Sequence, residues 1–292
     1  MIPMAIEGLT IIGESINDSV PSTRALFDAG DMEGIVELAR FQAARGARYL
    51  DVNVGSRGPG FMAEVVRRIQ EAVDVPLAID TPDPEMARAG LEAYDPGRAG
   101  GAVPILNSVS PLRTEMFKLA AVRPFKPILL ASERHEDGRS GPCRTAEQTH
   151  QAARQLVRAA RQSGRGWTNE ELIIDPGVAP LASDSEGNLK RLLAAMERIH
   201  RDPELAGVHM SVGLSNLTVM LPARRADGSP LKGPLESALL TKAMPLGLDM
   251  IVGSVRRKYQ LLPPDHPAMI CLDQLLEAEG FEAILRLRDF YS

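Results

Sequence analysis

The chain has 292 residues, of which 44% are hydrophobic and 24% are charged, and its formal net charge is −5. This composition excludes a largely disordered chain, and the acidic balance argues against a protein that binds nucleic acid through its phosphates. Glu7 and Glu14 lie where a secretory signal would be apolar, and no apolar run reaches the ~18 residues that cross a bilayer, so we expect a cytoplasmic protein with no membrane association.

Eight short apolar runs predict the strands of a sheet. They lie at 9–12, 49–54, 76–79, 103–106, 127–131, 171–174, 208–212 and 250–252. Each run is too short for a helix and too continuous for a strand with one face in water. Such runs are typical of the buried strands of a parallel sheet.

Segments with the apolar spacing of helices alternate with these runs. They cover 34–45, 61–73, 84–93, 145–162, 188–200, 233–244 and 269–291. Thr81, and Thr145 three residues before Gln148, are expected to cap two of them. Alternation of strand and helix repeated about eight times predicts one α/β domain over residues 1–292, a single (β/α)₈ TIM barrel.

A doubly wound open sheet is the alternative fold. Such a sheet would carry a Gly-rich GxGxxG turn after its first strand when it binds a dinucleotide. The sequence has no such turn there, and the nearest glycine cluster, at 57–60, follows the second strand. The barrel is therefore the favoured interpretation.

Polar residues stand at the ends of most predicted strands. In chain order they are Glu14, Asn17, Asp51, Asn53, Asp80, Asn107, Ser108, Asp175, Ser215, Asn216 and Ser254. Any one of them could be an ordinary turn or capping residue. Because the carboxyl ends of all barrel strands meet at one face, the set together predicts a binding site there.

The chemistry of this set is restricted. It contains neither His nor Cys, which zinc and non-haem iron sites normally use, so we expect no metal. It also contains no Lys for imine chemistry and no nucleophile elbow. Carboxylates and carboxamides suit a flat heterocycle, because a carboxylate accepts two parallel hydrogen bonds from a ring N–H and an adjacent amino group.

Six of these segments, in this order, resemble a known family. They read GESIN (13–17), DVNVG (51–55), IDTP (79–82), NSVS (107–110), DPGVAP (175–180) and GLSN (213–216). The run ESALLTKAMPLGLDMIVGS at 236–254 matches as well. The chain is similar, from residue 11 to its last helix, to the pterin-binding methyltransferases that move a methyl group between tetrahydrofolate and a corrinoid protein.

The resemblance implies roles for individual residues. Asp80, Asn107 and Asp175 correspond to ligands of the pterin edge, and Gly213 and Ser215 to the loop against which the folate packs. Asn216 corresponds to the catalytic residue beside N5 of the pterin. The substrate would be tetrahydrofolate or 5-methyltetrahydrofolate, the cobalamin would be carried by a separate corrinoid protein, and the chain would form a homodimer.

Two other functions remain open, and so does a second role for Asn216. Dihydropteroate synthase shares the barrel, but that enzyme would carry a Ser-Arg-Lys type motif where this chain reads GLSN. A non-catalytic folate-binding subunit would keep the same binding residues. Asn216 would then be only a cap of the helix that follows the seventh strand.

Two segments depart from the family pattern. Residues 132–147 are longer, more polar and more charged than the family's usual turn, and residues 217–233 form a basic loop rich in Pro and Gly. We expect both at the barrel mouth, where the corrinoid partner docks. The basic runs at 224–225 and 256–258 are either solvated or meet the glutamate tail of a folate.

Overall fold

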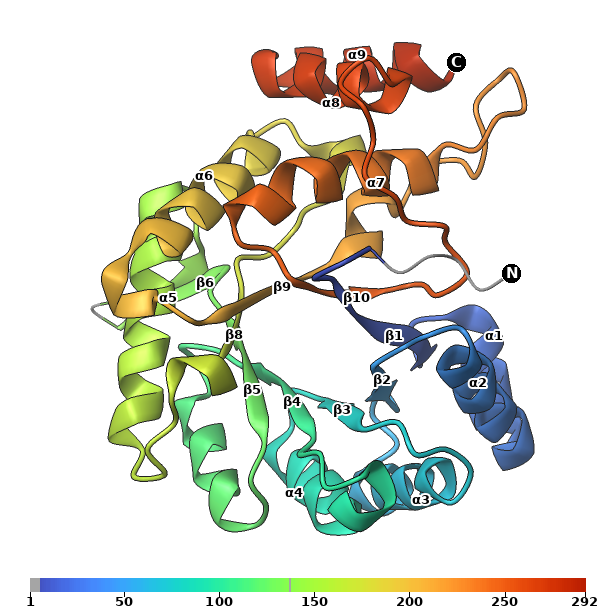
Figure 1. Cartoon of the computed structure of the whole chain (residues 1–292), viewed down its shortest axis with the longest axis vertical. Helices are drawn as coiled ribbons and strands as arrows, with labels where there is room; N and C mark the ends of the chain where they lie inside the picture. The colour runs from blue at the N-terminus through green and yellow to red at the C-terminus, as the bar shows by residue number, and fades with distance from the viewer. Residues whose placement is uncertain (1–5, 137) are drawn as a thin grey trace.

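Eight parallel strands close into a barrel, as Figure 1 shows. The computed structural model describes residues 6–136 and 138–292. The strands are β1 (Thr10–Asn17), β2 (Tyr49–Asn53), β3 (Leu77–Asp80), β4 (Ile105–Val109), β5 (Lys126–Leu130), β8 (Ile173–Asp175), β9 (His209–Gly213) and β10 (Met250–Gly253). They follow one another around the barrel, and β10 pairs with β1 to close it. The predicted (β/α)₈ fold is confirmed.

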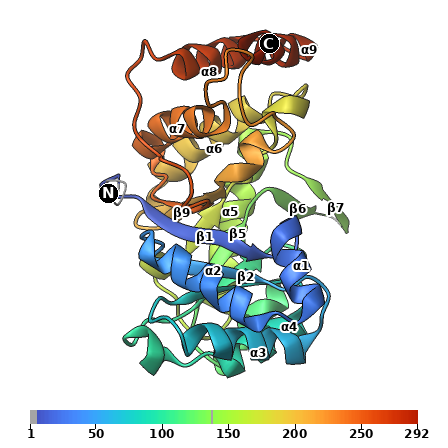
Figure 2. The same ribbon diagram turned by 90° about the vertical axis from the view of Figure 1, so that its right-hand side faces the viewer.

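Helices surround the barrel on its outer side (Figures 1 and 2). They are α1 (Pro21–Ala29), α2 (Met32–Ala44), α3 (Pro59–Gln70), α4 (Pro84–Ala93), α5 (Ala146–Gln162), α6 (Asn188–Arg201), α7 (Lys232–Ala243), α8 (Pro267–Glu277) and α9 (Phe281–Tyr291). Thr145 caps α5 as expected, because its hydroxyl accepts a hydrogen bond from the Gln148 N–H at 3.1 Å. The expected Thr81 cap is wrong: Asp83 caps α4, accepting from the Glu85 N–H at 2.8 Å.

Other parts of the structure differ from the prediction. The expected helix at 269–291 is two helices, α8 and α9, which are separated by a break that ends at Gly280, whose φ is +57°. The segment 132–147 is not all loop, since it contains an antiparallel hairpin of β6 (Glu133–Glu136) and β7 (Arg139–Pro142). Figure 2 shows this hairpin projecting beyond the body of the barrel.

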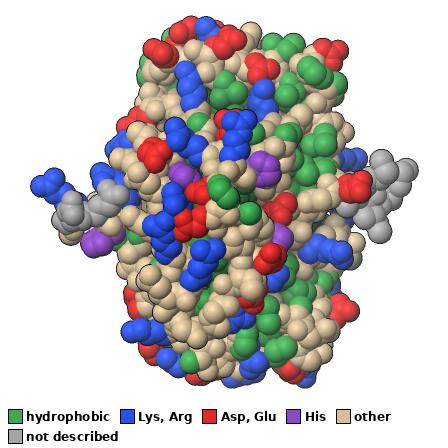
Figure 3. Space-filling view, turned by 60° about the vertical axis from the view of Figure 1, so that its left-hand side comes forward, with side chains coloured by type: hydrophobic (Ala, Val, Ile, Leu, Met, Phe, Trp, Pro, Cys, Tyr) green, Lys and Arg blue, Asp and Glu red, His purple; other side chains and the backbone are tan. Residues whose placement is uncertain are grey.

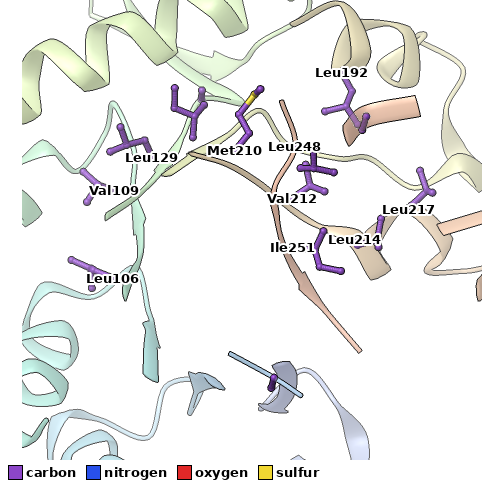
Figure 4. Packing of buried hydrophobic residues seen from close by; sticks show 14 of the residues in the cluster. Leu106, Val109, Leu129, Leu192, Met210, Val212, Leu214, Leu217, Leu248 and Ile251 are labelled. Carbon is purple, nitrogen blue, oxygen red and sulfur yellow. The ribbon is translucent and has the colours of Figure 1, made fainter. Parts of the chain in front are cut away.

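The hydrophobic core has two parts. A small cluster fills the barrel interior and consists of Ile12, Ala78, Ile105, Ile128, Ile173 and Met250. A larger cluster lies between the strands and the surrounding helices, and Figure 4 shows part of it, including Val212 and Ile251 of the strands and Leu192 of α6. The interior cluster closes the barrel with an apolar layer, as is usual for this fold.

Charged side chains of both signs are mixed on the face that Figure 3 brings forward. On the helices of that side, Arg158 of α5 pairs with Glu204 at 2.7 Å, and Arg198 of α6 pairs with Glu147 at 2.7 Å. Because acidic partners accompany the arginines, α5 and α6 do not present a surface of one sign. Among the described helices, none is both long enough and apolar enough to cross a membrane.

Candidate functional site

A cavity of about 660 Å³ opens at the carboxyl ends of the strands. Side chains alternate between the two faces of a strand, so the residue two positions after an inward-facing one also faces inward. Each barrel strand therefore contributes one inward-facing residue to the cavity, two positions after its residue in the layer that closes the interior. These residues are Glu14, Asp51, Asp80, Asn107, Leu130, Asp175, Gly213 and Val252. Four carboxyl groups and one carboxamide of this ring therefore lie directly above the apolar layer.

All six site residues predicted from the sequence line this one cavity. Asp80, Asn107 and Asp175 belong to the ring, and Gly213, Ser215 and Asn216 lie at the end of β9 and just beyond it. Their roles in binding or catalysis remain predictions. The sequence motifs give Glu14 and Asp51 no role beyond that of polar strand-end residues. The two-residue step from the apolar layer is the signal that assigns them to the cavity.

Asp51 and Asp80 form a coupled pair of carboxyl groups. Asp51 is 1% exposed, and its pKa lies well above the usual range because of burial and the negative charge of Asp80. Burial also raises the pKa of Asp80, although hydrogen bonds from Asn53 (Nδ2 to Oδ2, 2.9 Å) and Asp51 oppose this shift. Burial therefore raises the pKa of both carboxyl groups, and the charge of Asp80 raises that of Asp51 further.

Asp175 is held by the turn that follows it. Its carboxylate accepts a hydrogen bond from the Gly177 N–H at 2.7 Å. Burial raises the pKa of Asp175 to about 6, opposed by that hydrogen bond and by the positive charge of Arg191. Arg191 comes from α6, where no sequence motif indicated a site role, and donates to the carbonyl oxygens of Pro176 at 2.9 Å and Gly177 at 2.7 Å.

Position 177 accepts only glycine. Its φ is +74°, and a Cβ placed there would overlap the Cβ of Ser132, the residue before β6. Both the backbone conformation and the space therefore exclude a larger residue. The base of the hairpin and the turn after Asp175 are in direct contact.

A one-turn 3₁₀ helix, η6 (Leu214–Thr218), follows β9 and carries the residues at the cavity rim. Leu214 and Leu217 are buried in the core (Figure 4). On the other side, the Ser215 hydroxyl donates a hydrogen bond to the Glu14 carboxylate, whose pKa is raised by burial. The helix thus has one face in the core and one face on the cavity.

Asn216 is exposed at the cavity and does not cap a helix. The next α-helix, α7, begins only at Lys232, and Gly213 occupies the cap position of η6. Within the part of the chain that the structure describes, the Asn216 carboxamide makes no hydrogen bond. It lies close to Gly213, where a Cβ would come within 2.8 Å of Nδ2.

The basic runs near the carboxyl end do not reach the cavity. Arg225 lies over the Phe290 ring at 4.5 Å, and Arg256 lies over the Phe41 ring at 4.4 Å. Arg257 pairs with Glu236 at 3.2 Å. Of the described residues that line the cavity, none is Lys or Arg, so the structure gives no support to contact with a glutamate tail inside it.

The donor set of the cavity is made of oxygen and amide nitrogen. Within residues 6–136 and 138–292, no three His, Cys, Asp or Glu side chains are grouped as a metal ion would require. A barrel with such a cavity at the carboxyl ends of its strands has the architecture of a TIM-barrel enzyme site.

Comparison with known proteins gives the family. Residues 16–252 match the family of pterin binding enzymes, and the chain belongs to that family. A methylcorrinoid:tetrahydrofolate methyltransferase of Eubacterium limosum is 28% identical to it over 251 residues, which is 84% of each chain.

Solved structures with the same fold include dihydropteroate synthases. The enzyme from Vibrio fischeri has a TM-score of 0.55 at 17% identity and covers 85% of this chain and 88% of its own. The enzyme from Thermus thermophilus has a TM-score of 0.53 at 23% identity and covers 86% of this chain and 89% of its own. At such identities the likeness concerns the fold alone.

Proposed function

We propose that the protein is a cytoplasmic methyltransferase that moves a methyl group between N5 of tetrahydrofolate and the cobalt of a corrinoid protein. One observation carries the proposal: a carboxamide without a hydrogen bond among the described residues, Asn216, shares one cavity with the polar ring that contains Asp80, Asn107 and Asp175. The methylcorrinoid:tetrahydrofolate methyltransferase of Eubacterium limosum, 28% identical, supports the reaction type.

The ring fits the edge of a pterin. A pterin presents a ring N–H beside an amino group, and a carboxylate accepts both hydrogen bonds in parallel. Asp80 of β3 and Asp175 of β8 supply such carboxylates, and Asn107 of β4 supplies both a donor and an acceptor. A volume of about 660 Å³ lies within the range of pockets that enclose small ligands.

Asn216 would act on the nitrogen that gives up the methyl group. An uncharged tertiary amine is a poor leaving group, so N5 must become protonated as the N–CH₃ bond breaks. The Asn216 carboxamide oxygen can accept a hydrogen bond from that N–H, and this bond strengthens as positive charge develops. The corrinoid is a second substrate on another protein, and its cobalt supplies the electron pair that takes the methyl group.

The corrinoid partner would approach over the barrel mouth. Two segments stand there: the β6–β7 hairpin, preceded by Ser132, and the chain after η6, beginning with Val219. Both Ser132 and Val219 line the cavity, so a partner that covers it would contact both segments.

We also propose a homodimer, which light scattering of the purified protein would test.

Methyl transfer itself tests the proposal. The protein is mixed with 5-methyltetrahydrofolate and free cob(I)alamin, and the formation of methylcobalamin is followed by its absorption spectrum. Transfer well above the uncatalysed rate supports the proposal. A protein that binds the folate but transfers nothing would be a binding subunit. Condensation of a pterin with an arylamine would make it a synthase, although residues 213–216 read GLSN instead of a Ser-Arg-Lys type motif.

A further inference from the structure

Glu236 of α7 is a buried carboxylate outside the cavity. It is 0% exposed, and its Oε1 accepts a hydrogen bond from the hydroxyl of Thr218, the last residue of η6, at 2.5 Å. Thr218 is itself 1% exposed. A buried carboxylate is costly unless it is paired, so this contact is a built feature of the packing between α7 and η6.

A second group holds Glu236 from the other side. Arg257, in the segment after β10, places its Nε 3.2 Å from Oε2 of Glu236. Burial raises the pKa of Glu236, and the Thr218 hydroxyl and Arg257 both oppose this shift. Glu236 therefore links η6 to the chain that follows the last barrel strand.

The opposite side of η6 is fixed by a second carboxylate. Ser215 donates to Glu14 of β1, while Leu214 and Leu217 are packed in the core (Figure 4). Asn216 lies between Ser215 and Thr218 in sequence and has no hydrogen bond among the described residues. The position of its carboxamide is therefore set by the placement of η6.

We propose that Glu236 is a positioning residue, which acts through Thr218 to fix the one-turn helix that carries Asn216 at the cavity rim. The inference rests on the proposed function, since it assigns Asn216 to the reacting nitrogen. A displacement of about 1 Å can cost on the order of 10²-fold in rate. Asp80, Asn107 and Asp175 lie on strands, and Ser215 keeps its own hydrogen bond to Glu14, so we expect pterin binding to change little.

A matched pair of variants tests this role. Thr218→Val removes the hydroxyl at nearly constant volume. Thr241→Val is the control, because the Thr241 hydroxyl also serves α7, donating to Ser237 O at 2.9 Å and accepting from Leu262 N at 2.9 Å, without contacting η6. We expect Thr218→Val to lower kcat at least about tenfold, with KM for 5-methyltetrahydrofolate within about twofold of the parent. Thr218→Ser, which keeps the hydroxyl, should have the parental kcat. Thr241→Val should keep the parental kcat and KM.

A readout independent of activity separates this inference from the proposed function. Hydrogen–deuterium exchange of residues 214–221 should be faster in Thr218→Val than in Thr241→Val. If the parent transfers no methyl group, the proposed function fails, and the exchange difference still decides whether Glu236 holds η6. Equal exchange, or equal kcat in an active parent, for the two variants overturns the inference. Should Thr218→Val not fold, Thr218→Ala, which also lacks the hydroxyl, takes its place in the same exchange comparison.

Discussion

Asn107 of β4 donates a hydrogen bond from its Nδ2 to Oδ1 of Asp51 on β2, at 3.2 Å. The bond reaches past β3, which lies between these two strands. It orients the Asn107 carboxamide and leaves its oxygen and one N–H for a ligand in the cavity. Asp51 therefore fixes the orientation of the Asn107 side chain in the cavity.

Asp51→Asn should be tolerated, whereas Asp51→Ala should not. Burial and the charge of Asp80 hold the pKa of Asp51 well above its usual range, which disfavours its charged form. A carboxamide has the shape of a carboxyl group and keeps an acceptor for Asn107. Asp51→Ala removes the acceptor of the Asn107 hydrogen bond, which contributes about 0.5–1.5 kcal/mol. Urea unfolding at pH 7 measures both variants, and equal stability of the two would mean that the hydrogen bond from Asn107 does not stabilise the fold.

Asp175→Asn and Asp80→Asn should each weaken folate binding by roughly 1.5–3 kcal/mol, the range for hydrogen bonds to charged groups. Each change replaces a carboxylate that accepts two hydrogen bonds with a group that both donates and accepts. Calorimetric titration with 5-methyltetrahydrofolate gives the affinities. If both variants bind within a factor of two of the parent, the pterin lies elsewhere.

The titration of Asp175 predicts a pH effect on stability. Burial raises its pKa from 3.8 in the unfolded chain to about 6 in the fold, so the folded state binds more protons between these values. The contribution of Asp175 to stability is therefore present below about pH 4 and lost as the pH rises through about 6. The shift is worth on the order of 3 kcal/mol.

Asp175→Asn isolates this effect. The free energy of unfolding of the variant relative to the parent should increase between pH 4 and pH 6, because only the parent loses the contribution of this group. Denaturant unfolding across that range measures the difference, and the other carboxyl groups cancel in the comparison. A difference that stays constant with pH would mean that Asp175 titrates at an ordinary pKa.

Asn216→Ala should lower the rate of methyl transfer by ~10²–10³ while folate binding changes little, as expected for a group that acts mainly in the transition state. Because the side chain does not cap a helix, its loss should leave the melting temperature nearly unchanged. Single-turnover transfer to free cob(I)alamin with saturating 5-methyltetrahydrofolate measures the rate. Parental turnover by the variant would remove Asn216 from the mechanism.

The strands and the cavity residues were predictable because both depend on local sequence. Strands buried on both faces read as continuous apolar runs, and the carboxyl end of every strand faces the same mouth, so Asp80, Asn107 and Asp175 could be placed together. Elements without a clear apolar period were missed. The α1 helix buries only Thr23 and Phe27, and the β6–β7 hairpin is almost entirely polar, so neither has the pattern that predicts an element.

Contacts between distant elements could not be predicted. The bond from Asn107 to Asp51 requires the order of strands around the barrel. Arg191 reads as an ordinary polar residue of the amphipathic α6, and Glu236 begins a largely buried stretch of α7. Nothing local to either helix indicates the turn or the 3₁₀ helix that each residue holds. Gly280 interrupts a helical period without removing it, which is why α8 and α9 appeared as one helix.

The layering of the barrel separates the residues that preserve the scaffold from those that set its chemistry. The interior apolar cluster, with Ile12, Ile105 and Ile173, closes the barrel one step below the polar ring, so substitutions in the ring leave that packing intact. Selection can then revise what the mouth recognises while the barrel persists, which is how a chain 17% identical to the synthase from Vibrio fischeri keeps its fold. Directed evolution of this protein should accordingly find new ligands more readily by varying the upper residues of its strands than by varying those beneath.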